Sequence, residues 1–73
     1  MRAIPHHTKS VIENTINILL DIQIKSEELS PSIDFQICKA IYNLLELVPS
    51  MYPISREHKE QMEYAINVIR EVL

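Results

Sequence analysis

Residues 9–25, KSVIENTINILLDIQIK, decide the fold class because their polar side chains recur at one fixed spacing. Five of the charged and amide side chains follow one another at intervals of four positions, and side chains at this spacing are neighbours on the surface of an α-helix. The positions between them are almost wholly apolar. The stretch therefore predicts an amphipathic helix with one solvated stripe, made of Lys9, Glu13, Asn17, Asp21 and Lys25.

Two residues near the N-terminus could begin this helix. Ser10, with Glu13 three positions later, has the spacing of a capping box, in which a hydroxyl and a carboxylate each satisfy a backbone N–H group at the helix start. Thr8 is the alternative cap, and Pro5 lies upstream of both. We therefore predict a first helix over about residues 8–25.

A second helix is predicted over residues 31–48. Ser30 is a favourable N-cap, and Pro31 suits the first helical position because its φ is fixed and its missing N–H group is not needed there. Pro49 ends the helix, since a proline disfavours helical conformation at the residue before it. The polar stripe of this helix consists of Gln36, Lys39, Asn43 and Glu46.

A third helix is predicted over residues 55–73. Ser55 can cap its start, and Glu57 lies near the positive end of the helix dipole. A connection with two prolines precedes it, and we expect the apolar side chains of that connection to fold back on the helices: Met51, Tyr52 and Ile54. Residues 26–29, which join the first two helices, form either an irregular connection or one short extra turn.

These elements place the chain in the all-α class, as a single domain over residues 1–73 built as a small bundle of three main helices. A chain of 73 residues buries only about 60% of the surface that its unfolded form exposes. Its hydrophobic core must therefore be efficient or be shared with another chain.

The composition excludes several classes of protein. The chain has no glycine, and glycine is needed in phosphate-binding loops, dinucleotide-binding motifs and nucleophile elbows. A formal charge of −3 with scattered cations gives no basic patch for nucleic acid. Cys38 is the one cysteine, so no intramolecular disulfide can form, and no apolar run is long enough to cross a membrane. We expect a small acidic cytoplasmic protein.

The first two helices carry more apolar surface than a three-helix bundle needs. A surface helix usually hides an apolar arc of a little over about 100°, and these two are apolar over roughly twice that arc. On the first helix, Val11 and Ile18 form one shoulder of the arc, while Ile16 and Leu20 form the other. Three helices packing only on one another would leave some of these shoulders in water.

The second helix has a comparable ridge. Phe35 and Tyr42 lie seven positions apart near its polar stripe, and Cys38 and Leu45 continue the ridge toward the core. Contiguous exposed apolar patches usually mark association sites, so we expect a homodimer through the first two helices. The alternative is that the connections cover these side chains. The candidate interaction surface consists of Val11, Ile18, Phe35, Cys38, Tyr42 and Leu45.

No residue pattern indicates catalysis, a cofactor or a metal site. His6 and His7 are adjacent and point in different directions, so they cannot chelate one ion as an i, i+4 pair would. Cys38 lies in an apolar stretch with no neighbouring base to lower its pKa. We therefore predict a non-enzymatic chain without a cofactor.

The segments VIENTINILLD (11–21) and QICKAIYNLLE (36–46) resemble the two central helices of the small enterobacterial biofilm-development and two-component connector family. The resemblance consists of apolar spacing together with Cys38 and Glu46. Pro49, Pro53 and the longer connection between the first two helices depart from the family pattern. The resemblance implies an all-helical dimer that acts by binding other regulators, and it assigns no functional residues.

The segment LDIQIKSEELSPSIDF (20–35) resembles the end of the first helix and the following loop of acyl and peptidyl carrier proteins. In that family a serine carrying phosphopantetheine opens the second helix, and Ser32 is the position that matches. Pro31 replaces the aspartate that the family places before the serine.

The sequence therefore predicts a non-catalytic adaptor or regulator that binds itself and another protein. The alternatives are a carrier-like domain using Ser32 and an accessory structural subunit of a larger complex.

Overall fold

The computed structural model describes residues 5–26, 29–51 and 54–72. They form three helices: α1 (His6–Lys25), α2 (Pro31–Leu47) and α3 (Arg56–Val72). No strand occurs in these ranges. The predicted all-α class and the three-helix arrangement are confirmed.

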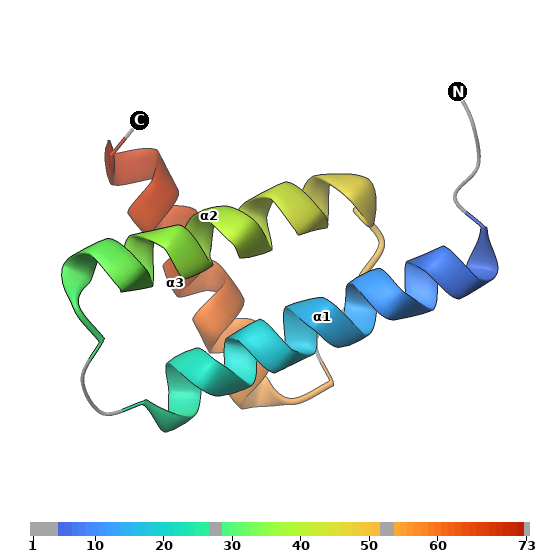
Figure 1. Ribbon diagram of the computed structural model, residues 1–73, viewed down its shortest axis with the longest axis horizontal. Helices are drawn as coiled ribbons and strands as arrows, with labels where there is room; N and C mark the ends of the chain where they lie inside the picture. The colour runs from blue at the N-terminus through green and yellow to red at the C-terminus, as the bar shows by residue number, and fades with distance from the viewer. Residues whose placement is uncertain (1–4, 27–28, 52–53, 73) are drawn as a thin grey trace.

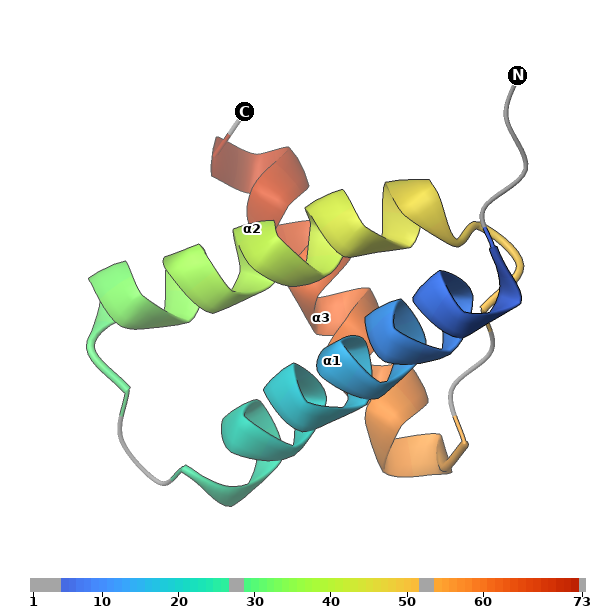
Figure 2. The same ribbon diagram turned by 45° about the vertical axis from the view of Figure 1, so that its right-hand side comes forward.

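The helices are arranged in two layers. In Figure 1, α1 and α2 run in opposite directions across the view, and α3 crosses behind both of them. The rotated view in Figure 2 shows the same arrangement, with α3 on one side of the α1–α2 layer. One side of the α1–α2 layer is therefore covered by α3, and no helix of the described residues lies on the other side.

Two of the three predicted helix starts are confirmed. The Oγ atom of Ser30 accepts a hydrogen bond from the backbone N–H of Ile33 at 3.3 Å, and Pro31 is the first residue of α2. At the start of α3, Ser55 Oγ accepts from the N–H of His58 at 3.2 Å. Both serines satisfy an N–H group that the helix itself leaves without a partner.

The predicted start of α1 is wrong. The helix begins at His6 with Pro5 as its N-cap, and no side chain caps it. Thr8 and Ser10 both lie inside the first turns. The carbonyl oxygen of Pro5 accepts a hydrogen bond from the N–H of Lys9 at 2.9 Å, so the backbone begins the helix without using either hydroxyl.

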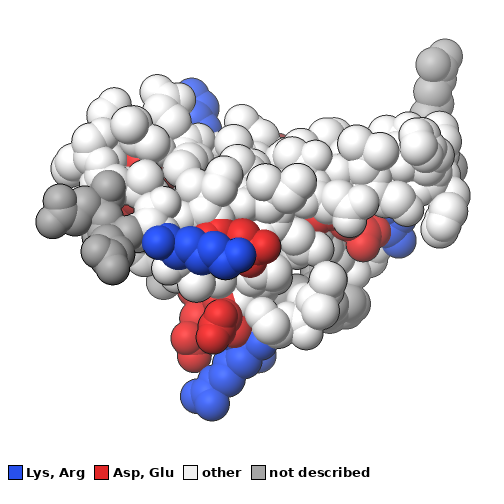
Figure 3. All heavy atoms as spheres, turned by 60° about the horizontal axis from the view of Figure 1, so that its bottom comes forward, with Lys and Arg blue, Asp and Glu red and all other residues white. Residues whose placement is uncertain are grey.

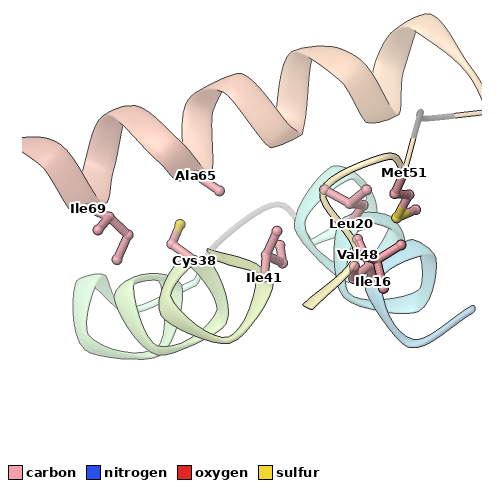
Figure 4. Packing of buried hydrophobic residues seen from close by; sticks show 8 residues of the cluster. All are labelled: Ile16, Leu20, Cys38, Ile41, Val48, Met51, Ala65 and Ile69. Atoms are coloured by element: carbon pink, nitrogen blue, oxygen red, sulfur yellow. The ribbon is translucent and has the colours of Figure 1, made fainter. Parts of the chain in front are cut away.

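The hydrophobic core lies between the α1–α2 layer and α3, and Figure 4 shows it as two adjoining groups of side chains. One group joins α2 to α3, and there the small side chains of Cys38 and Ala65 point toward one another. The other group joins α1 to the end of α2. The buried core residues are Ile16, Leu20, Cys38, Ile41, Val48, Met51, Ala65 and Ile69.

The connection before α3 matches the prediction only in part. Met51 is buried, and its N–H donates to the carbonyl oxygen of Val48 at 3.1 Å, so the chain turns back on the core there. Ile54 is 82% exposed, so the expectation that it packs on the helices is wrong. Ile54 directly precedes the Ser55 cap, where the chain has already left the core. Tyr52, and the middle of the proposed turn at 26–29, lie outside the described residues.

The predicted orientation of α1 is also wrong. A step of four residues turns the chain by about 400°, so a stripe with this spacing drifts around the helix by about 40° at each step. Its first four members, Lys9 to Asp21, are half-buried instead of facing solvent. Ile16 and Leu20, predicted as one shoulder, are both fully buried. They form the centre of the inward side of α1.

Candidate functional site

The outward side of α1 is apolar. Placed at about 100° per residue, Val11, Ile18 and Ile22 lie opposite the buried Ile16 and Leu20. All three are at least 40% exposed, and Ile18 reaches 59%. The structure thus places Val11 and Ile18 at the surface and adds Ile22 to them.

The exposed apolar residues of α2 are not those of the predicted ridge. Phe35 and Tyr42 are half-buried, and together with Ile69 of α3 they line a cavity of about 130 Å³. Leu45 is half-buried against the core, and Cys38 is fully buried. Because these residues face α3 and the core, they offer little surface to a partner, and Cys38 offers none.

The exposed apolar side of α2 lies about 180° around the helix from Phe35 and Tyr42. It carries Ile33 and Leu47, which are 53% and 52% exposed. Since α3 contacts the side of α2 that carries Phe35 and Tyr42, the side chains of Ile33 and Leu47 point away from α3. We call the uncovered side of the α1–α2 layer the open face, and its exposed members are Val11, Ile18, Ile22, Ile33 and Leu47.

Charged side chains gather away from the open face. In Figure 3 the band of surface that follows α1 is largely white, and charged side chains lie below it, toward the start of α3. The polar stripe of α2 is exposed along its whole length, as predicted. The five exposed apolar residues of the open face carry no charge, and Asp21 and Lys25 lie beside Ile18 and Ile22 at its edge.

A second feature joins all three helices through polar side chains. Gln23 near the end of α1 is only 8% exposed. Its Nε2 group donates to Asp34 Oδ1 at 3.2 Å and to Cys38 Sγ at 3.1 Å. The hydroxyl of Tyr64 on α3 donates to the other carboxylate oxygen of Asp34. Asp34 therefore links the start of α2 to both of its neighbours.

This cluster shifts the pKa values of two of its members. Donation of the Tyr64 hydroxyl to Asp34 is the main cause that raises the pKa of Tyr64 from 10.0 to about 12. Burial raises the pKa of the Cys38 thiol, which favours the uncharged form and makes this cysteine a poor nucleophile. The cluster consists of neutral donors around one carboxylate.

The Tyr64 contact predicts an alkaline transition. Because the pKa of Tyr64 is raised on folding, its hydrogen bond stabilises the fold fully below pH 10 and loses that effect between pH 10 and about 12. In a spectrophotometric titration of tyrosinate we expect one phenol to ionise near pH 12. Tyr64→Phe should remove that late phase, whereas Tyr42→Phe should leave it. A titration in which every phenol ionises near pH 10 would contradict this contact.

A separate polar contact joins α1 to α3. Nε2 of His58 lies 2.7 Å from Oδ1 of Asp21, and this hydrogen bond is the main cause that lowers the pKa of the Asp21 carboxyl. The contact therefore stabilises the fold above the ordinary carboxyl pKa, and the stabilisation is lost as the pH falls through the lowered value. It also explains why Asp21 is only half exposed.

The remaining sequence candidates gain no new partner. Ser32 is exposed at the second position of α2, so its hydroxyl is open to modification, and the carrier hypothesis stays a prediction. His6 and His7 are exposed at the start of α1. Within the described ranges, no group of three or more His, Cys, Asp and Glu side chains could hold a metal ion. None of the helices α1 to α3 is both long and apolar enough to cross a membrane.

The polar cluster was missed by the sequence reasoning. The signal was Gln23, which lies three and seven positions after Leu20 and Ile16 and so shares their buried side of the helix. A polar residue at such a position requires a hydrogen-bonding partner from another helix.

Comparison of the chain with protein-family models, with curated proteins and with solved structures found no match in any of the three. The two family resemblances therefore stay predictions, and the proposals below depend on the geometry of the chain itself.

Proposed function

We propose that this chain is a small non-catalytic regulator or adaptor of the cytoplasm that acts by binding proteins and self-associates through its open face. The observation that carries the proposal is the exposed apolar side of α1 and α2, which α3 leaves uncovered. Exposed apolar patches bordered by polar residues mark association sites.

A second copy of the chain suits the open face for three reasons. Val11, Thr15, Ile18 and Ile22 are separated by four, three and four positions, which is the spacing of the seam in a coiled coil. Stacking two α1–α2 layers would give each layer a helix layer on both sides. None of the five exposed apolar residues carries a charge, so two copies can bring these side chains together without placing like charges opposite each other.

The area required is also available. A standard interface buries about 800 Å² of each partner, and the chain exposes 5567 Å² in total. The five exposed apolar residues would form the centre of such a patch, and neighbouring residues of α1 and α2 would form its polar rim. The regulatory part of the proposal draws on the layout that resembles the connector family, whose members bind other regulators as dimers.

The test is the mass of the chain in solution. Wild-type protein at tens of micromolar should sediment as two chains. Ile18→Glu should shift it to one chain without loss of helicity, because the new carboxylates would be buried opposite each other. Loss of a central interface contact of about 2 kcal/mol or more corresponds to a dissociation constant raised roughly thirtyfold.

Val72→Glu provides the matched control, since Val72 is 61% exposed but lies at the end of α3, away from the open face. This variant should sediment as wild type. A wild-type mass of one chain would overturn self-association. A mass of two chains in Ile18→Glu would overturn the open face as the interface.

A further inference from the structure

We propose that the cavity beside the polar cluster binds a protonated amine or guanidinium group. The cavity has a volume of about 270 Å³ and lies where the end of α1, the start of α2 and the middle of α3 meet. Residues from all three helices and from the first connection line it: Gln23, Ser26, Leu29, Asp34, Gln61 and Tyr64.

The hydrogen-bond donors of the cluster are already in use. The Nε2 group of Gln23 donates to Asp34 and Cys38, and the Tyr64 hydroxyl donates to Asp34. Tyr64 is protonated at neutral pH, and its pKa is raised further, from 10.0 to about 12. A carboxylate or a phosphate could accept from the Gln61 amide and the Ser26 hydroxyl on the wall, but it would also face the carboxylate of Asp34.

Acceptors are in excess. The Oε1 atom of Gln23 is buried and has no hydrogen-bond partner among the described residues, although a buried polar atom of this kind normally has one. Each carboxylate oxygen of Asp34 accepts one bond within the cluster, and each can accept a second. The amide oxygen of Gln61 is a further potential acceptor on the wall. The cavity is therefore built to receive donors.

The charge of the wall selects a cation. Asp34 is the one residue with an ionisable carboxylate among the six that line the cavity, and none of the six is Lys or Arg. An ammonium group brings three N–H donors and a guanidinium group brings five, with no acceptor to compete. Hydrogen bonds between such a group and a carboxylate are about twice as strong as those between neutral partners.

The size of the cavity limits the ligand to a small head group. Its volume of about 270 Å³ is below the roughly 300–1,000 Å³ of sites for larger ligands. Tyr64 is 43% exposed at the rim, where its ring can also contact a cation. The head group could belong to a free small amine or to a Lys or Arg side chain of a partner protein. No residue of the open face lines the cavity, so the proposed cation site does not depend on self-association through that face.

The test is a titration followed by NMR through the side-chain amide signals of Gln23 and Gln61. The probes are propylguanidinium and propylammonium chloride, with propanol and sodium propionate as the neutral and anionic controls. Both cations should produce saturable shifts at these two amides and at Tyr64, with the controls producing none. Asp34→Asn, which keeps the shape and removes the charge, should weaken cation binding at least tenfold.

The matched control is Glu63→Gln, which removes a charge from an exposed position of α3 that does not line the cavity. It should bind as wild type. Gln61→Met removes a potential acceptor from the cavity wall and should weaken cation binding, which keeps the test valid where Asp34→Asn does not fold. The site would be overturned by cation-induced shifts that do not saturate, or by equal shifts from propionate. Equal losses of cation affinity in Asp34→Asn and Glu63→Gln would also overturn it.

A capped peptide with one central arginine separates the two sources of the head group. Tighter binding of the peptide than of propylguanidinium would assign the site to a side chain of a partner protein. Tighter binding of the free cation would assign it to a small molecule. Either result supports a cation site, whereas binding of neither probe would overturn it.

Discussion

Replacing Leu20 by alanine is expected to destabilise the chain by about 2–5 kcal/mol, the usual range for a buried leucine truncated in a core. Leu20 is fully buried at the centre of the inward side of α1. A domain below about 70–80 residues rarely has more than about 3–5 kcal/mol of total stability. Urea unfolding followed by circular dichroism should therefore show a variant that is partly unfolded even without denaturant.

Ile18→Ala is the control, two positions away on the same helix. Ile18 is 59% exposed, so its truncation should change the free energy of unfolding of the single chain by no more than about 0.5 kcal/mol. The free energy of unfolding should be measured at concentrations where the chain is monomeric, because Ile18 is part of the proposed interface. Equal losses of stability in Leu20→Ala and Ile18→Ala would show that α1 is rotated, so that Ile18 is as buried as Leu20.

The sequence was sufficient for the parts of the fold that depend on local interactions. Ser30, Pro31 and Ser55 act through hydrogen bonds and dihedral preferences within one helical turn, so their roles follow from a few neighbouring residues. The polar stripe of α2 alternates steps of three and four residues and therefore keeps to one side of its helix. The starts of α2 and α3 followed from these signals.

The orientation of α1 did not follow from its sequence because both sides of this helix are apolar. The five members of its predicted stripe recur only in steps of four, so they wind around the helix instead of marking one side. Contact with α2 and α3 decides which apolar side is buried, and the side with Ile16 and Leu20 was selected. The same reason explains why the open face contains Ile33 and Leu47 in place of Phe35 and Tyr42.

The cavity depends on contacts between residues that are distant in sequence. Gln23 and Asp34 are 11 positions apart, and Asp34 and Tyr64 are 30 apart. The spacing of Gln23 from Ile16 and Leu20 places it on their side of α1, but residue types do not indicate which carboxylate or hydroxyl it meets. The crossing of α3 over α2 determines this pairing.

That crossing predicts the second large effect, from Ala65→Leu. Ala65 is fully buried against Cys38 where α3 packs on α2, so a larger side chain has no space and should destabilise the chain by about 1–3 kcal/mol. The strain should also move α3 away from α2. Because Tyr64 is the adjacent residue, its hydrogen bond to Asp34 should weaken and its pKa should return from about 12 toward 10.0.

Asn67→Leu introduces the same side chain at an exposed position two residues along α3 and is the matched control. Its stability should stay within about 0.5 kcal/mol of wild type, with the late tyrosine ionisation unchanged. Urea unfolding and the tyrosinate titration measure the two effects independently. If Ala65→Leu lost stability but kept the late ionisation, the position of Tyr64 would not depend on this close contact of α2 and α3. If Ala65→Leu kept both its stability and the late ionisation, there would be free space between Ala65 and Cys38, which contradicts the close packing inferred from their full burial.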